Sequence, residues 1–88
     1  MKIKEGFVLR QVVDNFVVVA VGNSVFDFSG MTSLNETGAF IWHELEKGAT
    51  EEELVAALLK EYDVSEEVAR RDTAMYVQKL KDAGYVED

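Results

Sequence analysis

Residues 31–47, MTSLNETGAFIWHELEK, contain the change from strand to helix that determines the fold class of this 88-residue chain. Asn35 is a good helix N-cap, and Glu36 suits the positive end of a helix. Gly48 follows Lys47 as a natural stop. We therefore expect a short strand followed at once by a helix over residues 36–47.

Two apolar segments upstream favour a β-hairpin. Phe7–Val13 and Phe16–Val21 are rich in valine and phenylalanine, and only Asp14-Asn15 separates them. Met31–Leu34 then predicts a short third strand, which we expect at an edge of the sheet. Because Phe16–Val21 is apolar on both faces, something must cover its second face. The candidates are the N-terminal segment, Phe40, a second protomer in a homodimer, or a peptide or protein partner.

Downstream, apolar residues repeat at helical spacing in two further segments. Thr50 and Glu53 form a capping box that begins a second helix. Ser65 is the expected cap of a third helix, which Gly84 ends. The order of elements predicts an α+β fold, a winged-helix-like domain with a three-stranded antiparallel sheet followed by three helices. We expect residues 1–88 to form a single domain, because a chain of this size cannot support a second core.

Composition excludes several classes of function. The chain is 48% hydrophobic and 30% charged, which predicts a soluble globular domain without membrane spans. Its net charge is −8, of which residues 44–88 carry −7, and an acidic protein is a poor partner for nucleic acid phosphates. Cysteine is absent, which removes disulfides and thiolate metal sites. The N-terminus lacks the pattern of a secretory signal, so we expect a cytoplasmic protein.

The chemistry of catalysis is also missing. His43 is the only histidine, and on the predicted helix it points away from the apolar stripe among charged residues. The clustered glutamates fall in the first turns of helices, where the helix dipole favours negative charge. The sequence has no glycine-rich phosphate loop, nucleophile elbow or spaced metal-ligand set. We therefore expect neither an enzyme nor a bound cofactor or metal.

DNA binding has to be weighed, because the second and third helices have the outline of a helix-turn-helix. The N-terminal residues of a reading helix face the groove, and here they are Glu66 and Glu67. Arg70 and Arg71 alone cannot make the electrostatic potential at this end of the helix positive. One function that remains open is that of a small acidic winged-helix module with a structural or regulatory role, either as a monomer or as a homodimer.

The motifs along the chain resemble those of the PqqD family, named for pyrroloquinoline quinone biosynthesis and also known as the RiPP recognition element. Besides the hairpin and third strand, the resemblance rests on Leu34-Asn35-Glu36-Thr37-Gly38, Trp42, Gly48-Ala49-Thr50-Glu51-Glu52, Tyr62-Asp63-Val64-Ser65, Asp72, Leu80 and Ala83-Gly84-Tyr85. The family implies a domain without enzymatic activity. Its members bind the leader of a ribosomally made precursor peptide and present it to a modifying enzyme, often a radical S-adenosylmethionine protein.

The resemblance also implies a site, because the family's peptide lies between the third strand and the third helix. An edge strand can accept an extended peptide as a further strand. The Leu34–Gly38 motif is similar to that of relatives with varied substrates, so it does not specify the quinone pathway or a particular precursor. The expected peptide-binding residues are Met31, Thr32 and Ser33 on the strand and Arg70, Thr73 and Val77 on one flank of the helix, with Val68, Met75 and Lys79 on the alternative flank.

Overall fold

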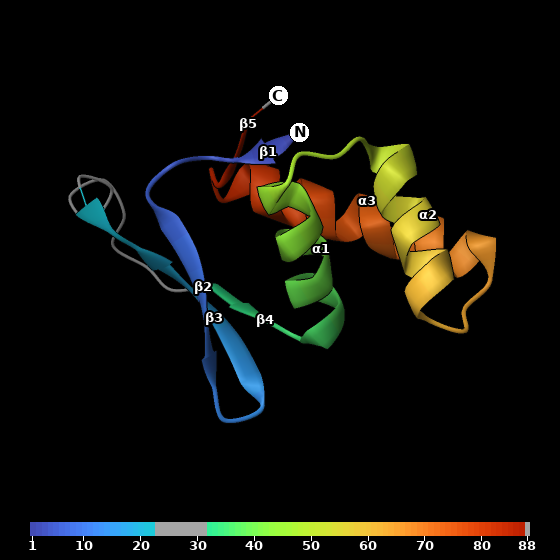
Figure 1. Ribbon diagram of the computed structural model, residues 1–88, viewed down its shortest axis with the longest axis horizontal. Coiled ribbons are helices and arrows are strands. Elements are labelled where there is room, and N and C mark those ends of the chain that lie inside the picture. The colour runs from blue at the N-terminus through green and yellow to red at the C-terminus, as the bar shows by residue number, and fades with distance from the viewer. Residues whose placement is uncertain (23–31, 88) are drawn as a thin grey trace.

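The computed structural model describes residues 1–22 and 32–87. In these ranges four strands come first, three helices follow and a short strand comes after them, an α+β fold (Figure 1). The sheet lies to one side of the helices, and α3 crosses behind α1 in this view. Met31, the first residue of the expected third strand, lies outside the described residues. The elements are β1 (Lys2–Ile3), β2 (Phe7–Val12), β3 (Asn15–Ala20), β4 (Thr32–Leu34), α1 (Glu36–Glu46), α2 (Glu51–Glu61), α3 (Glu66–Asp82) and β5 (Val86–Glu87).

The main sheet has the antiparallel order β2-β3-β4, which confirms the hairpin and the edge position of the third strand. The turn differs from the expected one. Val12 pairs with Asn15, so the loop is Val13-Asp14 rather than Asp14-Asn15. This register pairs six residues of each strand, and it places Val13 at a φ of 58°, a region that β-branched residues rarely adopt.

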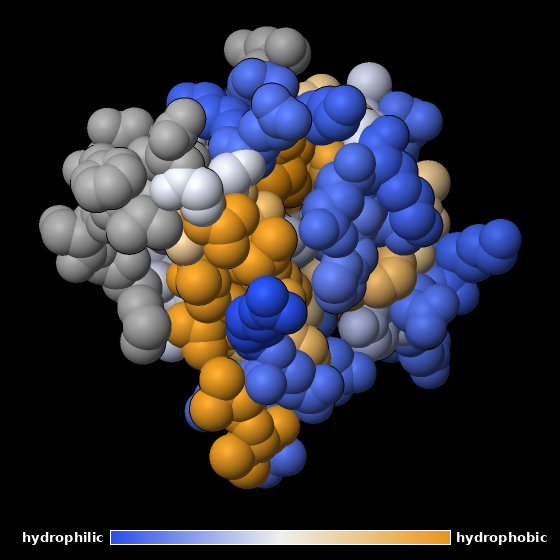
Figure 2. All heavy atoms as spheres, turned by 60° about the vertical axis from the view of Figure 1, so that its left-hand side comes forward, coloured by the Kyte–Doolittle hydropathy of each residue, from blue (hydrophilic) through white to orange (hydrophobic). Residues whose placement is uncertain are grey.

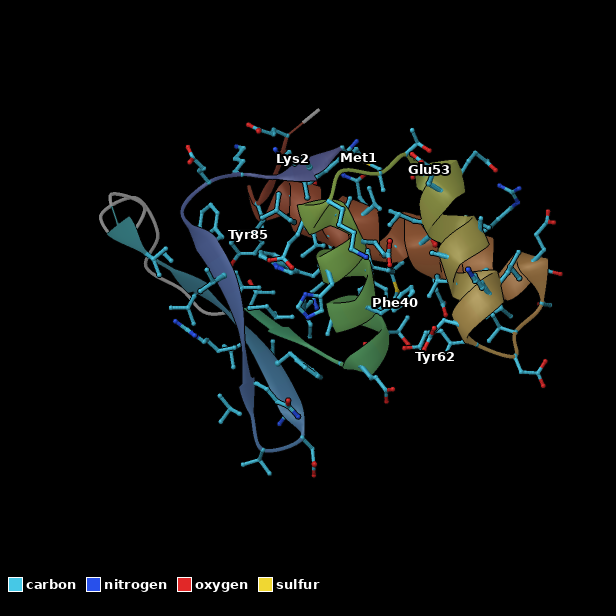
Figure 3. All side chains as sticks on the ribbon, in the orientation of Figure 1. Met1, Lys2, Phe40, Glu53, Tyr62 and Tyr85 are labelled. Carbon is cyan, nitrogen blue, oxygen red and sulfur yellow. The ribbon has the colours of Figure 1, made fainter. Side chains whose placement is uncertain are left out.

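The two faces of the sheet have different surroundings. Val18 and Leu34 are buried in the core on the helical face, and Phe16 packs partly against it. On the opposite face, Val17 is buried and Val19 is half-buried. Phe40, one candidate cover for that face, instead packs the edge of its ring against Tyr62, at a centroid distance of 5.5 Å. Figure 3 shows these two rings between α1 and α2.

Helix starts follow the expected caps. Asn35 Oδ1 accepts a hydrogen bond from the Gly38 N–H at 2.9 Å, and Ser65 Oγ accepts one from Val68 N–H. Thr50 and Glu53 form both bonds of the capping box. The core that these helices enclose centres on α1, whose Ile41, Trp42 and Leu45 are completely buried.

A second, two-stranded sheet joins the ends of the chain, which the sequence analysis did not anticipate. β1 pairs with β5, so that Ile3 lies opposite Val86, and the Lys4 N–H donates to the Tyr85 carbonyl at 2.8 Å. The strand near each end of the chain, β1 or β5, consequently lies beside the other (Figure 1). Tyr85 and Val86 are buried, as expected of residues that fold back on the core. The N-terminal strand is therefore paired with β5 and not with the hairpin.

Candidate functional site

The candidate site is the open edge of the main sheet at β4. Within the described residues, β4 pairs only with β3, so one side of the strand has no neighbouring strand. β4 passes directly into α1 through Asn35, which anchors the end of the strand to the helical layer. An unpaired edge of this kind can accept an extended chain through backbone hydrogen bonds.

The pairing pattern shows which backbone groups of β4 face outward. The Val21 N–H donates to the Gly6 carbonyl at 2.7 Å, so this opposed pair of residues is hydrogen-bonded. Bonded and non-bonded pairs alternate along an antiparallel ladder, so β3 directs its even-numbered residues toward β4. Their partners Thr32 and Leu34 therefore bond inward to β3. Ser33 directs its N–H and C=O outward, away from the sheet.

Side chains fix the inner side of β4 to the core. Thr32 Oγ1 lies 2.7 Å from the Tyr85 hydroxyl, which links the strand to the C-terminal segment. Leu34 is buried, whereas the Ser33 side chain is exposed on the opposite face. The strand is thus held by its inward groups, while the outward backbone groups of Ser33 have no partner strand within residues 1–22 and 32–87.

Tyr76 brings α3 against the end of β4. Its hydroxyl donates to Asn35 Oδ1 at 2.7 Å, the same oxygen that accepts from Gly38 N–H. A Cβ added to Gly38 would lie 3.0 Å from the Tyr76 ring and 3.1 Å from the Leu34 Cβ, so the three residues are closely packed. The flank of α3 that carries Tyr76 is therefore the flank beside β4.

The α3 residues expected to bind peptide occupy different surroundings. Thr73 is 0% exposed and Val77 is 3% exposed, so both belong to the core and offer almost no surface to a ligand. Arg70 is exposed, but its guanidinium binds Glu52 of α2 through two hydrogen bonds and Glu66 through a third. The structure does not bring these three side chains together with β4 as an accessible surface.

The alternative flank of α3 is more accessible. Met75 is 54% exposed, Val68 is half-buried, and Lys79 is exposed. On the helical wheel these residues lie on the side of the core stripe that carries Tyr76, opposite to the side of Arg70. At the level of sequence, Asn35 is recognisable only as a helix cap. A tyrosine hydroxyl needs a partner when its ring is buried, and this could have indicated the contact between Tyr76 and Asn35.

Hydrogen bonding and burial shift the pKa of particular ionisable groups among the described residues. Hydrogen bonds from Arg70 hold the pKa of the Glu52 carboxyl below its usual range, whereas burial raises the pKa of Tyr62. His43 Nδ1 lies 2.7 Å from Glu46 Oε1 on the exposed face of α1. In residues 1–22 and 32–87, no three histidine, cysteine, aspartate or glutamate side chains are grouped as metal ligands. No helix in these ranges has the length and apolarity needed to cross a membrane.

Comparisons with known proteins identify the family. The family model of coenzyme PQQ synthesis protein D matches residues 15–86. A solved structure of TbiB1 in complex with the TbiA(beta) leader peptide has a TM-score of 0.72 and 27% identity, covering 99% of this chain and 100% of that chain. A lasso peptide synthetase B1 complexed with the leader peptide has a TM-score of 0.75 and 26% identity, covering 99% of this chain and 96% of that chain. No sequence match is found among curated proteins. The chain belongs to the PqqD family.

Proposed function

We propose that this chain is a non-enzymatic peptide chaperone that binds the leader of a ribosomally synthesised precursor peptide and presents it to a modifying enzyme. Two similar solved structures, which match nearly the whole chain, are complexes with a leader peptide. The observation that carries the proposal is the open edge at β4, where Ser33 directs its backbone groups outward.

The leader binds as an additional strand beside β4. Its backbone bonds to the N–H and C=O of Ser33. Thr32 contributes by holding the strand to Tyr85, since its own backbone groups already bond to β3. Strand addition explains how a three-residue edge can bind peptides of different sequence, because backbone groups supply the affinity.

Side-chain selectivity comes from the α3 flank beside β4. We assign the wall of the groove to the side of α3 that carries Tyr76, with Met75 as its most exposed apolar residue. A flexible thioether can fit apolar side chains of varied shape. Thr73 and Val77 support this wall from the core and do not contact the leader. Arg70 fixes the position of α3 relative to α2 through its bond to Glu52.

The charge of the chain selects its partners. A net charge of −8 attracts a cationic leader and repels an acidic one. It also disfavours nucleic acid, and the basic residue nearest the start of α3, Arg70, is already bound to Glu52 and Glu66. We propose a cytoplasmic site of action, with residues 1–88 acting as one domain and a radical S-adenosylmethionine enzyme as the modifying partner.

The test is calorimetric titration of three chains: wild type, Ser33→Ala and Ser33→Pro. The proposal predicts a gene for a short precursor peptide beside this one, and a synthetic leader from that precursor is the first probe. The TbiA(beta) leader is the second probe. Ser33→Ala should bind like wild type because its backbone is unchanged. Ser33→Pro should lose at least about tenfold in affinity because proline removes the outward donor.

Two outcomes would contradict the proposal. If neither probe binds the wild-type chain, leader binding is wrong. If Ser33→Pro stays folded and binds as tightly as Ser33→Ala, strand addition at β4 is wrong. Repeating the wild-type titration at higher salt tests whether charge attracts the leader. Affinity for a cationic leader should fall as salt rises.

A further inference from the structure

The main sheet has a second open edge at β2, on the opposite side from β4. Within the described residues β2 pairs only with β3, and it is six residues long. Because even-numbered residues of β2 bond to β3, Leu9 and Gln11 direct their backbone groups outward. Edge strands are commonly protected by proline, lysine or a bulge, and β2 has none of these. Arg10 is its only charged residue.

Exposed apolar side chains accompany this edge. Val12 is 53% exposed, and Val13 in the turn is 83% exposed. Figure 2 shows apolar side chains extending down to the tip of the hairpin at the bottom of the view. Val13 also keeps a φ of 58°, a conformation in which glycine or asparagine is favoured. Neither the exposure nor the backbone conformation of Val13 favours the stability of an isolated monomer.

The distribution of charge points to a second copy of the chain as the partner. Residues 7–20 contain only Arg10 and Asp14 and are therefore neutral, whereas residues 44–88 carry −7. Two copies can approach through their hairpins while the acidic helical halves stay on the outer sides. Contact through the helices would instead bring together two strongly negative surfaces.

We propose that two copies pair antiparallel through β2, about a two-fold axis at Leu9. The outward-facing Leu9 and Gln11 then lie in bonded pairs, and Arg10 of each copy lies opposite Val8 of the other. A two-fold axis at Arg10 would place the two arginines opposite each other, which is unfavourable. The dimer has one continuous sheet in the order β4-β3-β2-β2-β3-β4. Both β4 edges remain at its outer ends.

This inference rests on the fold and not on the proposed function. It can be tested by sedimentation equilibrium of the full chain without any peptide. The apparent mass of the wild-type chain should rise from 9.9 kDa toward twice that value as its concentration rises. Gln11→Pro should stay monomeric because it removes an outward donor from β2. Ser33→Pro is the matched control on the other edge and should dimerise like wild type.

Two substitutions at Val8 test the proposed register of the β2–β2 pair, in which Val8 lies opposite Arg10 of the other copy. Val8→Glu places a carboxylate opposite Arg10 in two symmetric pairs and should tighten the dimer by about two- to tenfold. Val8→Lys should weaken it by a similar factor. Thermal melting checks that both variants are folded.

The results separate this inference from leader binding. A wild-type chain that remains a monomer up to about 1 mM overturns the dimer, whatever it does with a leader. Gln11→Pro or Val8→Lys chains that are folded and dimerise like wild type overturn the β2 interface. Monomeric Gln11→Pro with dimeric Ser33→Pro supports it, and the opposite pattern contradicts it.

Discussion

The two open edges of the main sheet differ in what lies beside them. β4 is three residues long, is held to Tyr85 through Thr32, and has the Tyr76 flank of α3 next to its end. β2 is six residues long and ends in an exposed apolar turn. Both edges lack a neighbouring strand in the part of the chain that the structure describes, so hydrogen bonding alone does not distinguish them. The helical wall beside β4 suits a selective peptide site, whereas the neutral surroundings of β2 suit self-pairing.

The largest loss of stability should come from proline at Thr32 in β4, and proline at the neighbouring Ser33 is the comparison. Thr32→Pro removes a donor that faces β3 and the hydroxyl contact with Tyr85, so it should cost about 3 kcal/mol or more in the free energy of unfolding. Ser33→Pro removes a donor that faces outward and should cost less than about 1 kcal/mol. Chemical denaturation measures both values. A larger loss for Ser33→Pro would reverse the inferred direction of the backbone groups.

Gly38→Ala should be the next largest change, because it perturbs the contact between β4 and α3. The new Cβ would meet Leu34 and the Tyr76 ring at 3.1 and 3.0 Å. We expect a cost of about 1 to 3 kcal/mol from overpacking, reduced by the better helix propensity of alanine. Thermal melting measures the result. A more stable Gly38→Ala protein would mean that Tyr76 is not packed against this turn.

Tyr76→Phe tests the hydrogen bond that joins α3 to the β4 end. Loss of the hydroxyl should cost about 1 kcal/mol, because Asn35 Oδ1 loses one of its two donors. Tyr62→Phe is the control, since the Tyr62 hydroxyl makes no hydrogen bond to the described residues. Denaturation measures the free energy of unfolding of both variants. Equal changes would mean that the bond between the Tyr76 hydroxyl and Asn35 does not stabilise the protein.

Val13→Gly tests how much the positive φ in the turn after β2 costs in stability. Glycine adopts a positive φ without steric cost, so the turn should become more stable by about 0.5 to 1 kcal/mol despite the larger entropy of the unfolded chain. Melting temperatures of the two chains at one concentration check this. A destabilised variant would show that the Val13 side chain contributes contacts that outweigh its backbone strain.

Much of the fold could be predicted because local signals and burial agree. The caps at Asn35, Thr50 and Ser65 start all three helices where expected, and the apolar stripes identify their buried faces. The hairpin turn was misplaced by one residue because Asp14-Asn15 has the better turn composition, whereas the register followed from pairing along the whole strand. The β1–β5 sheet was missed because two-residue strands carry no periodic signal.

The candidate site was only partly predictable from the sequence. The edge position of β4 follows from the order of strands, but the choice between the flanks of α3 depends on how the helix is rotated. Arg70 looked available on the sequence, yet Glu52 of another helix binds it. Thr73 and Val77 were expected to contact a peptide from one flank of the helix, and both lie inside the core. Packing between elements distant in sequence determines both the partner of Arg70 and the burial of Thr73 and Val77. The sequence of one helix does not contain that information.

Amide hydrogen exchange with and without leader tests the central claim most directly, because it reports on single backbone donors. The account predicts that saturating leader slows exchange of the Ser33 N–H by at least about tenfold, since this donor gains a partner in the added strand. Exchange at Leu9 and Gln11 should stay the same when leader is added at constant chain concentration. An unchanged Ser33 amide in a saturated complex, or leader-dependent protection at Leu9 and Gln11 instead, would contradict binding at β4.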